Sequence, residues 1–515
     1  MRKRLLLVIL GLAMVGMACS SGGGTGNKSS PGGTSSGQPR RGGDLIFLQV
    51  AEPPHLEPAE TYVNEALWDE LLIMEPLLAV TDDGHGVKPW VAKSYTLSDD
   101  HLTWTFKLRE GVKFSSGEPV TSADVKFSLE QASKADAWGF INAPIADGSI
   151  DTPDPQTVVI HTKEPWAPLA ATLSIFADAI LPNNYGGMQK DQFFQKPIGT
   201  GPFMIDQWVK GKSLKLVRNP NYWQKGKPYL DSVTFMVVPD DNTRINMLRG
   251  RQAHIIQQPP FSVLDSLKNE PGIDATAFPS SKADLLYLNT KRQPFQDKNI
   301  RQAIAYAIDR KSIVDAVLFG HGKVANSFIA PAVPGYNPGN EAPEFDPNKA
   351  KQLLAASSQP NGFKTTLQVP SSADGRIIGQ IIQQNLKDIG INVKIVTQDP
   401  GATFGNLTAF NYDMLAFAWT TDIPDADELI SGYADVDGQW TGLVSAPEAI
   451  RAARGIFDEA QRNQLYAEVQ KQVASDASVI ALFYSDFPYA FSEKVHGFKV
   501  LPTLNYHLED VWLSP

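Results

Sequence analysis

The residues best suited to hold a charged ligand lie between Trp419 and Asp422. Residues 412–418 are mostly apolar and predict a strand, so Asp422 stands just beyond a strand end, close to the indole of Trp419. A carboxylate beside an aromatic wall, shielded from water, makes a charge-assisted hydrogen bond that is stronger than a neutral one. The alternative is that Asp422 caps a turn near Pro424, and the residues alone leave both interpretations open.

Catalytic and metal-binding signatures are missing from the rest of the sequence. It contains no His-Glu-x-x-His, no Gly-x-Ser-x-Gly and no phosphate-binding Gly-x-x-x-x-Gly-Lys-Ser/Thr pattern. The eight histidines are scattered, and none has another histidine three or four residues away. Carboxylate pairs such as Asp99-Asp100 and Asp240-Asp241 fall in predicted turns, where solvent exposure is expected. We therefore expect no catalytic residue, no metal site, no cofactor and no enzymatic activity.

The elements that must position a site are clearest between residues 102 and 129. Apolar and polar residues alternate over residues 103–109, which predicts a strand, and the alternation resumes on a second short strand at residues 112–114. Thr121 and Asp124 have the spacing of a capping box, and an apolar stripe follows them. The segment predicts strand, turn, strand, loop and helix.

Helices and strands alternate later in the chain as well. Residues 300–308 carry a helical stripe, residues 374–389 form an amphipathic helix that stops at Gly390, and residues 391–395 alternate as a strand. A last long helix is predicted over residues 462–473. A helix, a stop glycine and a strand in succession indicate an α/β protein.

The segment 102–129 also resembles the signature region of the family-5 extracytoplasmic solute-binding proteins, the peptide- and nickel-binding proteins that serve ABC importers. Ser115-Ser116 replaces the family's commoner His-Asp pair, and Ser122 replaces an alanine. The resemblance runs from about residue 43 to the C-terminus. It rests on residues 106–114, 117–119 and 124–129, and on similar matches at residues 197–203, 219–223, 285–290 and 294–309.

The resemblance implies a two-lobed α/β fold of the periplasmic-binding-protein kind (type II, class C) with an extra inserted domain. The first lobe would comprise residues 43–75, 195–285 and 490–515, and the second residues 286–489. The inserted domain would span residues 76–194.

The resemblance also implies a function and a site. Trp419 to Asp427 are similar to a motif in which the aspartate receives the N-terminal ammonium of a bound peptide and the tryptophan lines the pocket. Asp422 and Trp419 take these roles here, and Tyr62 and Asn64 are further pocket candidates. Arg376 lies near the region where dipeptide binders hold the peptide carboxylate, but the match there is loose and no role is assigned to it.

The N-terminus predicts export and lipid anchoring. Residues 1–18 hold three basic residues, an apolar run too short to span a bilayer, and a small-residue end, which is typical of a cleaved signal. Cys19, the single cysteine, follows at once and resembles the lipidated residue of a bacterial lipobox. Residues 19–42 are rich in Ser and Gly and predict a flexible tether.

The charge of the chain bears on its partners. The net charge is −10, and because the signal carries three basic and no acidic residues, the mature chain carries −13. Such a chain is unsuited to nucleic acid.

We expect an anchored monomer in the periplasm or on the outer face of the cell membrane that captures peptides and passes them to an ABC permease and ATPase. The alternatives are the capture of an oligosaccharide, a nickel complex or another solute by a protein of the same kind, a secreted hydrolase, and a signalling or chaperone-like binding protein.

Overall fold

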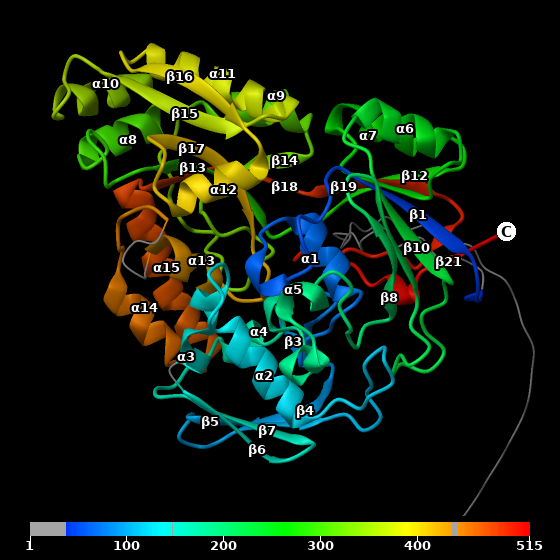
Figure 1. Ribbon diagram of the computed structural model, residues 1–515. Coiled ribbons are helices and arrows are strands. Elements are labelled where there is room, and N and C mark those ends of the chain that lie inside the picture. Colours follow the sequence, from blue (N-terminus) through cyan, green and yellow to red (C-terminus); the bar gives the residue numbers. More distant parts are fainter. Residues whose placement is uncertain (1–37, 147, 435–439) are drawn as a thin grey trace, which may run out of the picture. The chain divides into compact units, whose positions relative to one another are not determined.

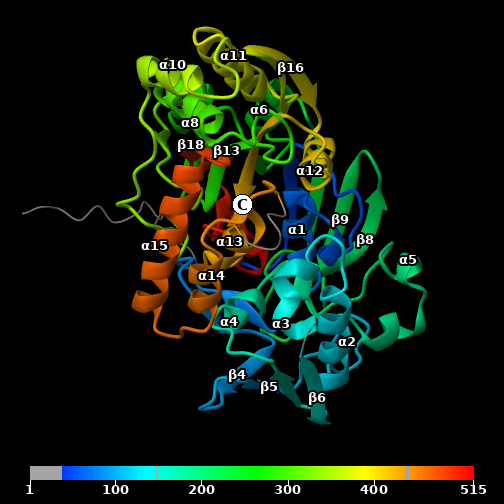
Figure 2. The same cartoon turned by 90° about the vertical axis from the view of Figure 1, so that its left-hand side faces the viewer.

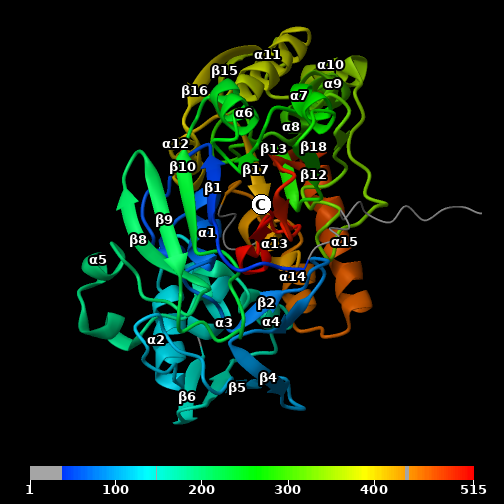
Figure 3. The ribbon, with the colours of Figure 1, turned by 90° about the vertical axis from the view of Figure 1, so that its right-hand side faces the viewer.

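Three larger β-sheets, with helices packed against them, organise the chain between residues 39 and 515 (Figure 1). The computed structural model describes residues 38–146, 148–434 and 440–515. In Figures 2 and 3 the four-stranded sheet lies at the lower end of the views and the six-stranded sheet at the upper end. None of the helices in the described ranges combines the length and apolar character needed to cross a membrane.

The seven-stranded sheet has the order β12-β19-β11-β1-β10-β9-β8. Strand β1 runs parallel to β10 and β11, which flank it, so the first strand of the fold lies inside the sheet. Helices α6 (Asp241–Arg249) and α7 (Phe261–Lys268) bury apolar side chains against it. The strands are β1 (Asp44–Gln49), β8 (Phe203–Val209), β9 (Ser213–Arg218), β10 (Ser232–Val237), β11 (Ile255–Gln257), β12 (Ile273–Phe278) and β19 (Phe487–Ser492).

The six-stranded sheet has the order β14-β18-β13-β17-β15-β16. Its strands are β13 (Lys282–Leu288), β14 (Gly322–Val324), β15 (Lys364–Pro370), β16 (Asn392–Gln398), β17 (Met414–Thr420) and β18 (Val479–Ser485). The helices of this part are α8 (Lys298–Ala307), α9 (Arg310–Leu318), α10 (Pro347–Ala355), α11 (Ala373–Lys387), α12 (Pro400–Thr408), α13 (Asp427–Ala434), α14 (Pro447–Arg454) and α15 (Glu459–Asp476). Strands β15 and β16 are parallel and joined through α11, as the helix–glycine–strand pattern predicts, and Gly390 takes the positive φ of a helix stop.

The four-stranded sheet has the order β4-β5-β7-β6 and carries α2 (Ser122–Ala132). The capping box predicted from Thr121 and Asp124 is present. The second short strand predicted at residues 112–114 does not form, because the loop there pairs only through a single bridge between Lys113 and Pro119. Its strands are β4 (Ala92–Leu97), β5 (Thr103–Leu108), β6 (Ser149–Asp154) and β7 (Thr157–His161).

Shorter elements complete the fold. They are α1 (Asn64–Leu71), α3 (Ala143–Ala146), α4 (Leu169–Thr172), α5 (Lys190–Phe193) and the paired strands β2 (Leu78–Val80) with β3 (Val87–Pro89) and β20 (Val495–His496) with β21 (Trp512–Leu513). The largest apolar core extends from Phe47 on β1 to Trp419 on β17, so it connects the two larger sheets. A candidate site near Trp419 is therefore built by elements of both.

Two neighbouring segments carry the chain between the seven-stranded and six-stranded sheets. Residues 279–281 join β12 to β13, and Asp486 alone separates β18 from β19. The hydroxyl of Ser280 donates a hydrogen bond to the carbonyl of Ser485 at 2.7 Å, which ties the two crossings together. The predicted division into lobes and an inserted domain stays a prediction, because residues 39–515 form one compact unit.

Candidate functional site

Asp422 lies in a loop between β17 and α13. Strand β17 ends at Thr420, and α13 begins at Asp427. Trp419 and Asp422 are both buried in the structure. The apolar stretch before Asp422 thus forms the strand that the sequence predicts, with bounds two residues later than expected.

Glu428, in the first turn of α13, holds this loop in place. One of its carboxylate oxygens accepts a hydrogen bond from the indole N–H of Trp419 at 2.8 Å. The other accepts from the backbone N–H groups of Asp422 at 2.8 Å and Ile423 at 3.1 Å. Burial raises the pKa of Glu428 to about 7, while these three donors act in the opposite direction and favour its ionised form.

Asp422 has a different environment. Its side chain is 4% exposed, and its Oδ1 atom has no hydrogen-bond partner among the described residues. Burial raises the pKa of Asp422 well above its usual range, and the negative charge of Glu428 raises it further. A buried carboxyl group with an unsatisfied oxygen is costly, so a ligand that supplies a cationic donor would be strongly favoured at this position.

Aromatic side chains from distant parts of the chain surround Trp419. The ring centroid of Trp440 lies 4.5 Å away, and those of Phe404, Trp138 and Tyr62 lie at 5.7, 6.0 and 6.5 Å. These five residues form what we call the aromatic cluster. Tyr62, which precedes α1, contacts Phe404 of α12 at 3.7 Å between ring centroids. Tyr62 precedes the first of the two chain crossings and Phe404 lies between them, so the cluster joins segments that the crossings separate.

The other sequence candidates take separate positions. Tyr62 donates its hydroxyl hydrogen bond to the carbonyl of Ala137 at 2.6 Å, so it presents a ring rather than a polar group to Trp419. Asn64 opens α1 and is half-buried, and within the described ranges no hydrogen bond joins it to Asp422 or to the aromatic cluster. Arg376 is exposed in the first turn of α11 and donates to the carbonyl of Ser371.

Two further acids of the same loop are paired with arginines. Asp425 accepts from Arg462 of α15 at 3.1 Å, and Asp427 accepts from Arg454 of α14 at 3.0 Å. The guanidinium of Arg454 also lies 4.7 Å from the ring of Trp166, which lies between β7 and α4. These ion pairs hold the loop in place. They give Asp425 and Asp427 cationic partners, which Asp422 lacks among the described residues.

A comparison with protein families decides the class of the protein. Residues 86–440, more than half of the chain, match the family model described as bacterial extracellular solute-binding proteins, family 5. The chain belongs to this family. The prediction from the sequence motifs is confirmed.

Similar proteins agree with this assignment. The glutathione-binding protein GsiB of Escherichia coli K12 is 29% identical over 447 residues, which cover 83% of this chain and 86% of GsiB. The solved structure of DppA from Helicobacter pylori in complex with the peptide STSA has a TM-score of 0.84 and 27% identity, covering 92% of this chain and 99% of that one. AgaA from A. tumefaciens R10, solved with agropinic acid, has the same TM-score and coverage with 28% identity.

The comparisons support the expectations from the sequence to different extents. The α/β fold is that of the type II periplasmic binding proteins of family 5. The protein is a solute-binding component of an ABC importer, and such proteins work outside the cytoplasm. Its relatives are substrate-binding proteins, which agrees with a non-enzymatic role. Cys19, the signal and most of the tether lie outside the described residues.

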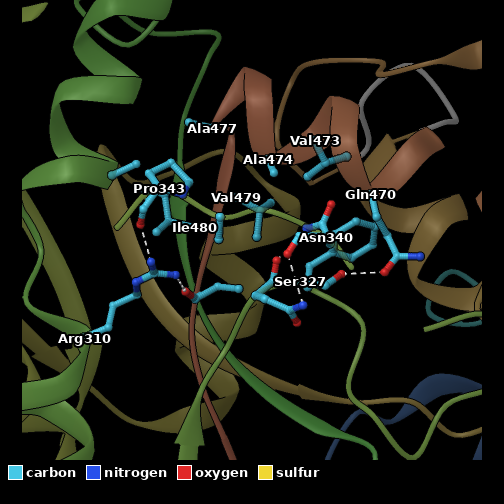
Figure 4. A pocket seen from close by; sticks show the side chains of 15 residues that line it. Arg310, Ser327, Asn340, Pro343, Gln470, Val473, Ala474, Ala477, Val479 and Ile480 are labelled. Carbon is cyan, nitrogen blue, oxygen red and sulfur yellow. Dashed lines mark hydrogen bonds between the residues drawn. The ribbon is translucent and has the colours of Figure 1, made fainter. Parts of the chain in front are cut away.

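Two small cavities that do not include Asp422 lie elsewhere in the described part of the chain. One, of about 20 Å³, lies between α15 and β18 (Figure 4), where Arg310 donates to the carbonyls of Ala325 and Ala481 and Ser327 donates to Gln470 at 2.8 Å. The other, of about 40 Å³, is lined by Glu75 and His507 among others. Spaces of this size hold about one or two water molecules and exclude a peptide.

Sequence reasoning missed Glu428 and three members of the aromatic cluster, Trp138, Phe404 and Trp440. Acidic residues are common in the first turn of a helix because they oppose the helix dipole, so the position of Glu428 carried no special signal. The three aromatic residues lie up to about 300 positions apart and outside recognised motifs. Only the folded chain brings them together.

Proposed function

We propose that this protein captures short peptides and that Asp422 receives their N-terminal ammonium group. The observation that carries the proposal is the buried Oδ1 of Asp422, which has no hydrogen-bond partner in the described part of the chain, in a loop held to the indole of Trp419 through Glu428. An ammonium group there gains a charge-assisted hydrogen bond and removes an unsatisfied buried acceptor. The relatives named above include one solved with a peptide and one named for glutathione, itself a small peptide.

The aromatic cluster supports a preference for an apolar first side chain. The rings of Trp419, Trp440 and Phe404 are buried and lie next to the loop that carries Asp422. Flat aromatic surfaces favour apolar side chains and also attract cations through their faces. Tyr62 and Trp138 would complete this wall from the other half of the fold. Asn64 stays a candidate for a polar contact further along the ligand.

Binding would proceed by closure of two lobes about the crossings at residues 279–281 and Asp486. These are the two places where the chain passes between the larger sheets, and the Ser280–Ser485 hydrogen bond holds them side by side. A ligand drives closure only if it binds the closed form more tightly than the open form. Contacts from Tyr62 on one side and Asp422 on the other would supply that difference, and the permease would then take the peptide.

The anchor would be a lipid on Cys19, with residues 19–42 as a tether between the membrane and a monomeric binding unit. A chain of this length and composition has a span of about 25–30 Å, which holds the protein clear of the headgroups. Cys19→Ser should move the protein from the membrane fraction to the soluble fraction. Unchanged fractionation would contradict the lipid anchor.

The test of peptide capture is a thermal-shift screen followed by calorimetry. Trialanine and other short peptides are compared with their N-acetylated forms, with sugars and with nickel. A ligand at about 100 times its Kd stabilises the folded protein by about 2.7 kcal/mol, which raises the Tm by several degrees. We expect this rise for free-amine peptides and none for acetylated ones.

Two variants assign the effect to a residue. Asp422→Asn keeps the shape of the side chain and removes its charge, so it should abolish the peptide-induced rise in Tm. Asp274→Asn makes the same chemical change at an exposed site on β12 and should leave the rise intact. If sugars or nickel raise the Tm while peptides do not, the substrate class proposed here is wrong.

A further inference from the structure

The carboxyl groups of Asp422 and Glu428, which we call the carboxyl pair, are buried together but are not equivalent. Both oxygens of Glu428 are occupied by N–H donors, namely the indole of Trp419 and the backbone of Asp422 and Ile423. An acid that accepts three such bonds ionises more readily than a buried acid that accepts none. Among the described residues, no N–H group donates to Oδ1 of Asp422. When one member of the pair is ionised, the negative charge therefore resides on Glu428, and Asp422 is the member that carries a proton in the empty protein.

The other charged and titratable groups around the carboxyl pair leave the proton on Asp422. Arg454 of α14 pairs with Asp427, and Arg462 of α15 pairs with Asp425, so these cations are directed at other acids of the loop. Within α13, the hydroxyl of Tyr433 bonds to that of Tyr287 on β13 at 2.7 Å. From the other half of the fold, Tyr62 faces Trp419 with its ring and directs its hydroxyl at a backbone carbonyl.

We propose that the binding of a primary ammonium ligand at Asp422 expels one proton from the carboxyl pair, and that Glu428 is the positioning residue that makes Asp422 exchange its proton for the ligand. This inference rests on the proposed function. The ligand enters as R–NH₃⁺, the Asp422 carboxyl group loses H⁺ to solvent, and the resulting carboxylate accepts a hydrogen bond from the ammonium. No covalent bond other than the O–H of Asp422 is broken.

The exchange makes affinity depend on pH in a defined way. While Asp422 of the empty protein is protonated, each pH unit raises the binding constant by about tenfold, because one proton is released for each ligand bound. The rise ends at the pKa of Asp422, which burial and Glu428 hold well above its usual range. Above about pH 8 the ligand's own amine loses its proton and the affinity falls. Molecules without a cationic amine cannot take part in the exchange.

The decisive experiment is isothermal titration of the wild-type protein with trialanine. Titrations at pH 6 in two buffers of different ionisation enthalpy count the protons released, and titrations from pH 5 to pH 8 give the pH profile. We expect release of about one proton per ligand at pH 6, with the count falling towards zero at higher pH. This measurement needs no variant, so it does not depend on the folding of a mutant.

Variants distinguish whether Glu428 controls the proton of Asp422 or only supports the loop. Glu428→Gln removes the neighbouring charge, which should move the pH profile to lower pH and reduce the proton count at pH 7. Loss of affinity with an unchanged profile would mean that Glu428 only supports the loop. Asp274→Asn should leave both the affinity and the proton count unchanged.

The outcomes also separate the two proposals. If trialanine binds with a pH-independent affinity between pH 5 and pH 7 and releases no proton, Asp422 is ionised before the ligand arrives. The present inference is then wrong, while the capture of peptides stands. If no free-amine peptide binds at any pH, both proposals are overturned.

Discussion

Gly432 is the residue whose lack of a side chain most directly shapes the site. A Cβ atom at Gly432 on α13 would lie 2.1 Å from Cζ3 of Trp440, well inside a van der Waals contact. Trp440 in turn lies 4.5 Å from Trp419 between ring centroids. Gly432→Ala should therefore displace Trp440 and destabilise the protein by about 1–3 kcal/mol. It should also weaken peptide binding. Chemical unfolding and calorimetry measure the two effects.

Gly405→Ala on α12 is the matched control. A Cβ atom there meets nothing within 4 Å, and alanine favours a helix over glycine by about 1 kcal/mol. This variant should leave the stability unchanged or slightly raised. Equal stabilities for the two variants would show that Trp440 moves aside without cost.

Among the single residues of the site, the sequence patterns identified those that belong to a motif and missed those that do not. Trp419 and Asp422 follow an apolar strand, and that local pattern sufficed to select them. The asymmetry between Asp422 and Glu428 depends on which N–H groups point at which oxygen. These hydrogen bonds form only in the folded loop, so the spacing of residues in the sequence does not predict them.

Among the elements, the helices and strands that periodicity predicts form within a few residues of the expected bounds, except for the strand expected at residues 112–114. The helix predicted over residues 374–389 is α11, and the one over residues 462–473 is the centre of α15. Gly199 and Gly201 show the limit. Neither glycine belongs to a periodic pattern, yet a Cβ atom at Gly199 would lie 2.1 Å from the carbonyl oxygen of Ile73. These glycines allow close approach to a segment more than 100 residues earlier.

The turn between α14 and α15 makes contacts that closure should require. Phe457 in this turn packs on His101 at 4.2 Å and near Trp104 at 6.1 Å between ring centroids, both in the region of the four-stranded sheet. In the proposed hinge closure these contacts would form across the two sides of the hinge, so they would stabilise the closed form alone. An aromatic contact is worth about 0.5–1.5 kcal/mol. Phe457→Ala should therefore weaken peptide affinity by roughly three- to tenfold through a faster release.

Phe345→Ala provides the comparison for this prediction. Phe345 is 46% exposed in a loop before α10, so its truncation should change neither affinity nor release rate. Stopped-flow release of a fluorescent peptide measures both variants. If Phe457→Ala releases peptide at the wild-type rate, the contacts of this turn do not contribute to closure.

The molecule as a whole buries an unusual set of acidic side chains. Burial raises the pKa of Glu65, Glu75, Asp178 and Glu428 to about 7, and it raises those of Asp69, Glu70 and Asp422 well above their usual range. Each of these groups binds its proton more tightly in the folded than in the unfolded chain. Their contribution to stability is therefore complete below about pH 4 and is lost as the pH rises through the folded-state pKa.

Other groups act in the opposite direction but more weakly. Hydrogen bonds lower the pKa of several aspartates, such as Asp83, Asp154 and Asp240, which stabilises the fold at higher pH. These side chains are at the surface, where water screens such interactions, so their effect is small. His507 adds to the main effect, because Glu509 raises its pKa and the pair loses its charge attraction as the pH rises.

The empty protein should therefore be more stable at pH 5 than at pH 8, by several degrees in Tm measured by scanning calorimetry. Asp178→Asn tests the cause, because Asn142 donates to one oxygen of Asp178 at 2.8 Å while the other oxygen is buried without a partner among the described residues. Asparagine mimics the protonated acid, so the variant should gain stability at pH 8 and change little at pH 5. Asp274→Asn, at an exposed position, should leave the difference between the two pH values intact. A Tm that is equal or higher at pH 8 would mean that water reaches these carboxyl groups and that their burial does not control stability.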